Sequence, residues 1–123
     1  MDGEIDLELY TISIIRLNSA LEKLENQEPI NEVKSMFCES ADDLNRLYED
    51  IIKDLNQDEI NINEYYLFFQ NGKQIFPQYI EVLGDIDNKE LDDEITSLIT
   101  TFNNFNKISD AFPQNEMMKW IMI

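Results

Sequence analysis

Histidine is absent from this chain of 123 residues, and cysteine occurs only once, at position 38. Without histidine the chain has no Ser–His or Cys–His pair, no imidazole general base and no imidazole metal ligand. We therefore expect a protein that is not an enzyme and that uses no metal or cofactor. Cys38 forms no internal disulfide, which is typical of a reducing compartment, and its helical setting predicts a passive, half-buried thiol.

Glycine, proline and long apolar runs are also scarce. The only glycines are Gly3, Gly72 and Gly84, so the sequence holds no glycine-rich loop for phosphate. No apolar run approaches the roughly 18 residues that indicate a membrane span. The first eight residues carry acidic side chains and no Lys or Arg, which is the opposite of a signal peptide. These absences predict a cytoplasmic protein that does not associate with membranes.

Basic residues are scarce compared with acidic residues. The chain has 26 Asp and Glu residues against 9 Lys and Arg residues, which gives a formal net charge of −17. Nucleic-acid binding needs clustered Lys and Arg, so this composition argues against it. Solubility is served by a net charge of about 2–8 in magnitude, and a larger excess destabilises a compact fold through self-repulsion. We interpret the excess as an adaptation to a basic protein partner.

What the chain does have is a regular apolar pattern. Hydrophobic residues make up 43% of the sequence and recur every three or four residues, which predicts amphipathic helices. The pattern covers residues 5–24, 30–55, 62–83 and 91–108. We therefore expect a single all-α domain over residues 1–123, an antiparallel bundle of four main helices with kinks. The apolar residues 117–123 predict a short C-terminal element, which packs in the core or forms a homodimer contact.

Two interruptions leave alternatives open. Ser40 places a polar residue in the apolar face of the second segment, so this segment is either one bent helix or two helices. In the third segment, Pro77 would clash with the carbonyl of Lys73 in a continuous helix. Residues 65–76 therefore form either two short helices or a hairpin around an Asn-Gly turn, and the apolar period favours the helices.

Acidic residues follow one side of the second segment. On a helical wheel they fall within an arc of roughly 60°, beside the apolar face. We call this set the acidic stripe, and it comprises Glu32, Glu39, Asp43, Asp50 and Asp54. A second acidic group, Glu90 and residues 92–94, precedes the fourth segment. The aromatic residues of the third segment are expected to pack mostly in the core, but Tyr65 and Tyr79 lie off the main apolar face, so we expect these two to be exposed anchors of a binding surface.

The spacing of the stripe bears on mimicry of DNA. Duplex DNA carries one charge per about 1.7 Å of axis. Carboxylates four residues apart on a helix are separated by about 6 Å, which is three- to four-fold sparser. A mimic of DNA would therefore need the carboxylates of several helices to align.

In size, acidity and cytoplasmic character the chain resembles bacterial immunity proteins that neutralise toxin nucleases, including those of contact-dependent inhibition systems. The resemblance extends over the whole chain as a profile, without a motif that assigns site residues. It implies an acidic inhibitor that binds and blocks a basic toxin nuclease or similar effector. The alternatives are a phage-type DNA mimic that blocks a restriction or CRISPR effector, and a chaperone or adaptor of a basic secreted protein.

Overall fold

The computed structural model describes residues 5–55 and 62–111. Within them it confirms the predicted all-α fold, because the described chain forms a bundle of four helices, preceded in the last case by a short 3₁₀ turn. These elements are α1 (Leu7–Glu25), α2 (Ile30–Leu55), α3 (Ile62–Gly84), η1 (Lys89–Leu91) and α4 (Asp92–Ala111). The expected element over residues 117–123 lies outside the described residues. None of the described helices combines the length and the apolar character needed to cross a membrane.

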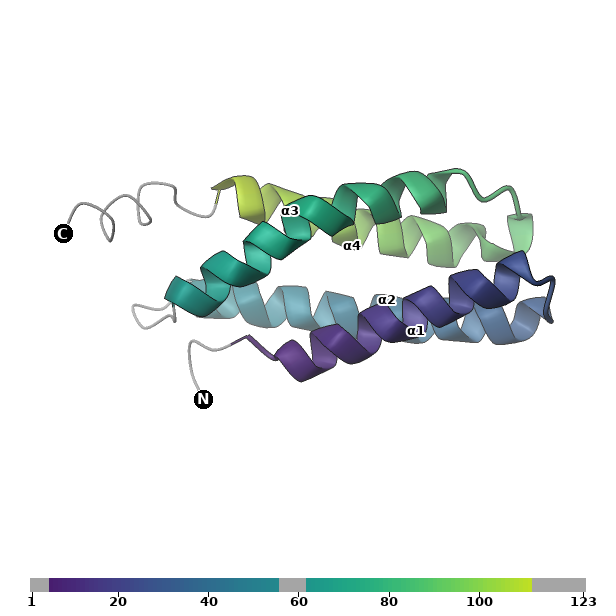
Figure 1. Ribbon diagram of the computed structural model, residues 1–123, viewed down its shortest axis with the longest axis horizontal. Coiled ribbons are helices and arrows are strands. Elements are labelled where there is room, and N and C mark those ends of the chain that lie inside the picture. The colour runs from purple at the N-terminus through teal and green to yellow at the C-terminus, as the bar shows by residue number, and fades with distance from the viewer. Residues whose placement is uncertain (1–4, 56–61, 112–123) are drawn as a thin grey trace.

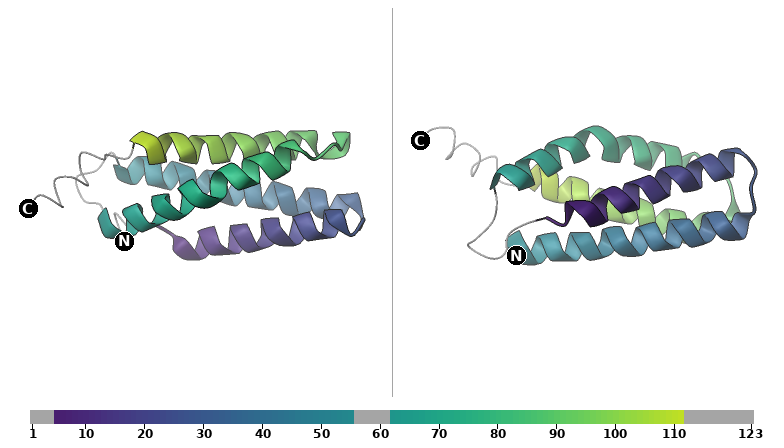
Figure 2. Two further views of the ribbon diagram at one scale, coloured as in Figure 1. Left: turned by 45° about the horizontal axis from the view of Figure 1, so that its top comes forward. Right: turned by 60° about the horizontal axis from the view of Figure 1, so that its bottom comes forward.

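The bundle consists of two helical hairpins laid against each other. α1 and α2 form the first hairpin, α3 and α4 form the second, and α2 packs against α4. Helices within each hairpin run antiparallel, whereas α2 and α4 run in the same direction, as do α1 and α3 (Figures 1 and 2). Residues 26–29 and 85–91, which connect the helices of the two hairpins, both lie at one end of the bundle (Figure 1). We call this end the turn end.

Local signals explain where the first two helices begin and end. Asp6 caps α1, because its side chain accepts a hydrogen bond from the backbone N–H of Leu9 at 2.9 Å. After α1, Gln27 adopts a left-handed conformation (φ 60°) and the N–H of Glu28 donates to the carbonyl of Lys23 at 2.9 Å. This pattern closes a helix C-terminus. Pro29 then precedes α2, and its carbonyl accepts hydrogen bonds from the backbone N–H groups of Glu32 at 3.1 Å and Val33 at 3.4 Å.

The α1–α2 interface resolves the question raised by Ser40. α2 is one helix, and Ser40 is fully buried where it meets α1. Its hydroxyl donates to the backbone carbonyl of Ser13 at 3.2 Å. Ser13 and Ala20 of α1 are buried as well. These small residues let the two helices pack closely, so the polar gap marks a helix contact and not a break in the helix.

α3 differs from both alternatives that the sequence left open. It is one helix that continues through Gly72 and Pro77, so the predictions of a hairpin and of two short helices are wrong. The helix is favoured because it places Phe68 and Phe76 on one buried face. A side chain at position 72 would collide with the ring of Phe76, which explains the glycine. Pro77 is exposed on the outer side, and α3 bends along its length (Figure 1).

The core lies between the two hairpins and is rich in aromatic rings. Phe76 is fully buried, and its ring centroid lies 5.3 Å from that of Phe102 and 5.2 Å from that of Phe105. From α1, Tyr10 contacts the ring of Phe68 edge-on, with centroids 4.9 Å apart. Such edge-to-face pairs stabilise a core beyond the area they bury. The aromatic residues of α3 therefore pack mainly against α4 within their own hairpin, and Tyr10 connects this cluster to α1.

Candidate functional site

The centre of the acidic stripe faces a cation from α1. Nε of Arg16 lies 3.3 Å from Oε2 of Glu39, and Nη1 of Arg16 lies 2.7 Å from Oδ2 of Asp43. The Asp43 side chain is 21% exposed, whereas that of Glu39 is 60% exposed. Because the guanidinium holds both carboxylates, this part of the stripe stabilises the α1–α2 hairpin and is partly neutralised.

The ends of the stripe also have partners within the chain. Nζ of Lys23 lies 3.1 Å from Oε1 of Glu32. At the other end of α2, Asp54 accepts a hydrogen bond from the Tyr65 hydroxyl at 2.9 Å. Asp50 is exposed, and it makes no ion pair among the described residues. The structure thus gives four of the five stripe residues an intramolecular role, and their binding to a partner stays a prediction.

The expected exposure of the two tyrosines is wrong for Tyr65 and only partly right for Tyr79. Tyr65 is fully buried, because α3 turns its N-terminal part toward α2. Burial raises the pKa of Tyr65, and the hydrogen bond to Asp54 raises it further. Tyr79 is half-buried, with its ring stacked on Phe102 at 5.4 Å and its hydroxyl donating to Oδ1 of Asn18 at 2.5 Å. Both tyrosines hold helices together.

The α1–α3 interface is spanned by long side chains. Tyr79 of α3 reaches Asn18 of α1, and the hydroxyl of Tyr10 of α1 donates to Oδ1 of Asn71 of α3 at 2.9 Å. Burial raises the pKa of Tyr10, with a further contribution from Tyr79. Because aromatic rings separate the helices here, their backbones do not approach as closely as those of α1 and α2.

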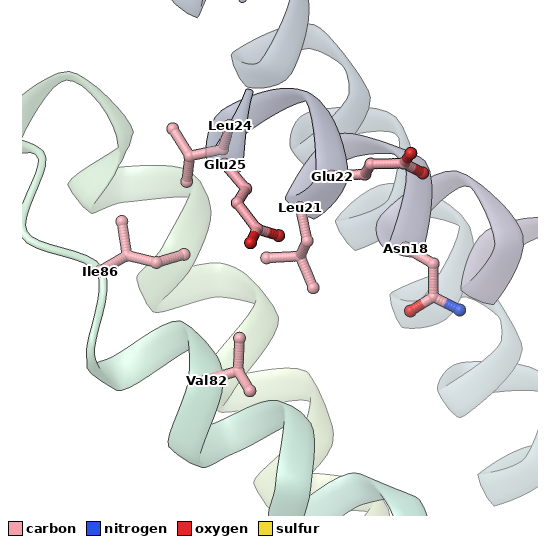
Figure 3. Close-up of a pocket in the computed structure, with 7 residues that line it drawn as sticks. All are labelled: Asn18, Leu21, Glu22, Leu24, Glu25, Val82 and Ile86. Atoms are coloured by element: carbon pink, nitrogen blue, oxygen red, sulfur yellow. The ribbon is translucent and has the colours of Figure 1, made fainter. Parts of the chain in front are cut away.

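Toward the turn end this interface opens into a groove of about 420 Å³. Leu21 and Leu24 of α1 point toward Val82 of α3 and Ile86 of the following connection (Figure 3). Val82 is 47% exposed, although it is a large apolar side chain. We call this hollow the α1–α3 groove, and it is lined by Asn18, Leu21, Glu22, Leu24, Glu25, Val82 and Ile86.

Carboxylates gather around the groove and over the rest of the turn end. About half of the described Asp and Glu residues lie within a turn or so of the two connections. They are Glu22, Glu25, Glu28, Glu32, Glu81, Asp85, Asp87, Glu90, Asp92, Asp93 and Glu94. The cations there are Lys23, Lys34 and Lys89; Lys23 pairs with Glu28 and Glu32, and Nζ of Lys34 lies 3.9 Å from Oε1 of Glu94. The turn end is therefore strongly negative.

The favourable effect of acidic residues at helix N-termini explains only some of the carboxylates at the turn end. Glu32 lies in the first turn of α2, and Asp92, Asp93 and Glu94 lie in the first turn of α4. Acidic residues stabilise a helix N-terminus, which carries partial positive charge. Glu22 and Glu25 lie instead in the last turn of α1, and Glu81 lies in the last turn of α3. There they meet the partial negative charge of a helix C-terminus, so their placement costs stability.

Cys38 is exposed, so the expectation of a half-buried thiol is wrong. The negative charge of Asp42 raises the pKa of the thiol, followed by desolvation and by Glu94 and Glu39. A raised pKa disfavours the nucleophilic thiolate, which agrees with a passive residue. Within the described ranges, no group of three or more Cys, Asp or Glu side chains is arranged to hold a metal ion.

Comparisons with models of protein families, with curated proteins and with solved structures found no match to this chain. The candidate site therefore depends on its geometry alone. The sequence interpretation placed the anchors at Tyr65 and Tyr79 and missed Leu21, Val82 and Ile86 as the lining of a groove. Acidic residues in the last turns of two helices, where they are unfavourable, were the available signal for this part of the molecule.

Proposed function

We propose that the protein is an acidic inhibitor, of the immunity-protein type, that binds and blocks a basic toxin nuclease or a similar effector. The observation that carries the proposal is the concentration of carboxylates at the turn end around an apolar groove. Clefts that bind nucleic acids are lined by Lys and Arg, so a negative surface is complementary to them.

The charge supports rapid capture of such a target. Opposite fields raise association rates to about 10⁸–10⁹ M⁻¹s⁻¹ at low salt, compared with 10⁵–10⁶ for partners without steering. Most of the stripe on α2 is engaged with Arg16, Lys23 and Tyr65. We therefore assign the steering to the turn end, where carboxylates outnumber cations most strongly.

The combination of a compact negative end with an apolar groove favours an inhibitor over a mimic of DNA. A mimic requires carboxylates aligned at duplex spacing along several helices. At the turn end the carboxylates instead surround a hollow. Along α2, the carboxylates of Glu39 and Asp43 are bound by Arg16 within the chain. An adaptor for a secreted protein would require an apolar groove along the helices, whereas the α1–α3 groove is confined to one end.

The test is to isolate the partner from the organism that encodes the chain and to measure inhibition directly. Tagged protein is used to purify bound proteins, and each is produced and assayed for nuclease activity with increasing amounts of the chain. We expect a basic partner, inhibition that is complete at an equimolar ratio, and an association rate that falls steeply with salt.

Two variants of equal charge locate the surface. Glu22→Lys/Glu25→Lys changes the turn end, and Glu49→Lys/Asp110→Lys makes the same change in net charge toward the opposite end of the bundle, at two exposed residues outside the acidic stripe. We expect the first pair to lower the association rate at least about tenfold and the second to lower it only slightly. A partner without net positive charge, or an association rate independent of salt, would contradict the proposed function.

A further inference from the structure

We propose that the α1–α3 groove receives an apolar side chain from a Lys- or Arg-rich segment of the partner, while the carboxylates around the groove pair with the flanking cations. This inference rests on the proposed function and specifies how the basic partner is recognised. It assigns to one place both the apolar anchor and the charge pairing.

The apolar part of the argument is the exposed lining of the groove. Leu21, Leu24 and Ile86 are only half-buried, and Val82, which forms the α3 side of the lining, is 47% exposed (Figure 3). The hollow of about 420 Å³ falls within the range of sites that bind side chains or small ligands, about 300–1,000 Å³. A partner side chain in this position would cover apolar surface that the bundle leaves in contact with water.

The charge part of the argument is the rim. Glu22 and Glu25 line the groove, and Glu81 and Asp85 are sequence neighbours of Val82 and Ile86. Among the described residues these four carboxylates make no ion pair with a Lys or Arg side chain. They therefore remain available to cations from outside the chain.

The direction of the helices adds to this negative potential. α1 and α3 run parallel, so both of their C-termini lie at the groove (Figure 1). Each helix C-terminus carries about half a negative elementary charge. Carboxylates beside two such termini destabilise the free protein, and a cation bound there would relieve the repulsion. This placement is unfavourable for folding but favourable for binding a cationic segment.

Charge also selects among the apolar segments that could occupy the groove. A second copy of the chain carries the same net charge of −17, and its own negative turn end would be repelled. A neutral apolar segment would leave the rim carboxylates without partners. A cationic segment with one apolar side chain satisfies both features of the groove.

The test uses three synthetic peptides of the same length as probes. The first carries a central leucine flanked by lysines, the second replaces the leucine with serine, and the third replaces the lysines with glutamines. Binding to the full chain is measured by titration, and the contacted residues are located by NMR shifts. We expect the leucine–lysine peptide to bind about tenfold more tightly than the serine–lysine peptide, as partial burial of a leucine implies.

Matched variants check the location. Val82→Ser removes the apolar side chain that α3 contributes to the groove, and Leu67→Ser makes a similar change at a residue of α3 that is 67% exposed, near the other end of the helix. We expect Val82→Ser to abolish the preference for leucine and Leu67→Ser to preserve it. Both positions are exposed, so both variants should fold, which is verified by circular dichroism.

The outcomes separate this inference from the proposed function. Equal binding of the leucine–lysine and serine–lysine peptides, or loss of the preference in Leu67→Ser but not in Val82→Ser, overturns the assignment of the groove and leaves the proposed function standing. Equal binding of the leucine–lysine and leucine–glutamine peptides overturns the requirement for a cationic partner and hence the proposed function. If the NMR signals of Val82 and Ile86 shift with protein concentration in the absence of any peptide, the groove binds a second copy of the chain, and the inference is overturned.

Discussion

α1 has two interfaces that are built in different ways. On one side it packs closely on α2, where the hydroxyl of buried Ser40 reaches the carbonyl of Ser13 and Arg16 binds two carboxylates. On the other side it is joined to α3 through the long side chains of Tyr10 and Tyr79. The first interface is filled by small residues and ion pairs, and the second ends in a groove.

The difference teaches how one helix contributes to both stability and binding. Small residues bring backbones together and leave no room for a ligand. Aromatic residues keep the helices apart while filling the middle of the interface, so the space beyond them stays open. The acidic residues follow the same division. Those of α2 that face α1 pair with Arg16 and Lys23, whereas Glu22 and Glu25 at the groove make no ion pair among the described residues.

The largest effect should come from removing the central aromatic residue of the core. Phe76→Ala deletes a fully buried ring that contacts Phe102, Phe105 and Tyr10. We expect the free energy of unfolding to fall by about 3–5 kcal/mol, measured by urea denaturation. A loss below about 1 kcal/mol would show that this aromatic cluster does not stabilise the bundle.

Adding volume to each interface tests the contrast directly. Ser40→Leu overfills the α1–α2 contact and should destabilise the protein by about 1–3 kcal/mol. Val82→Leu adds a methylene to the open groove and should change the free energy of unfolding by less than about 0.5 kcal/mol. If the two substitutions had equal costs, the two interfaces would be equally filled and the comparison would fail.

High pH should weaken the tyrosine-based interface selectively. Burial raises the pKa of Tyr10 in the folded state above its ordinary value of 10.0, which the unfolded chain retains. The stabilisation is therefore complete below about pH 10 and is lost as pH rises above it, because the unfolded state releases the proton first. Thermal unfolding followed from pH 8 to 11 should show this decline, and it should be shallower in Tyr10→Phe. An equal decline in both proteins would exclude Tyr10 as its source.

The smallest effect concerns the ion pairs of the first interface. Arg16→Gln removes the cation that binds Glu39 and Asp43, whose side chains are partly exposed. We expect a loss of about 1 kcal/mol at low salt that shrinks in 1 M NaCl, measured by urea denaturation. Lys73→Gln, on α3, provides a control because the described residues give Lys73 no ion pair. Equal losses in the two variants would indicate a general effect of charge.

The sequence predicted the helices well, because each apolar stripe is a local property of a segment. It left Ser40 and residues 65–76 ambiguous, since the deciding contacts, Ser13 with Ser40 and Phe76 with α4, join residues far apart in the chain. The acidic stripe required a continuous helix, and α2 is one helix over its whole length. The residues that face the stripe could not be predicted, because Arg16 lies on a different helix and reaches the stripe only through the packing of α1 on α2.

The groove could not be predicted from the sequence for the same reason. It exists only because α1 and α3 are neighbours that run in the same direction, which no segment encodes by itself. Tyr65 was expected to be exposed from its position relative to the main apolar face of α3. It is buried because α3 also contacts α2 near its N-terminus, through the hydrogen bond to Asp54.

Because the bundle has four helices and consecutive ones run antiparallel, its first helix begins and its last helix ends at the same end of the molecule, which has a practical consequence. α1 begins and α4 ends at the end of the bundle away from the groove (Figure 1). A surface tether joined directly to the start of α1 or to the end of α4 would leave the bundle at that opposite end. The bundle is therefore suited to immobilisation on a sensor surface with its negative end directed toward the solution.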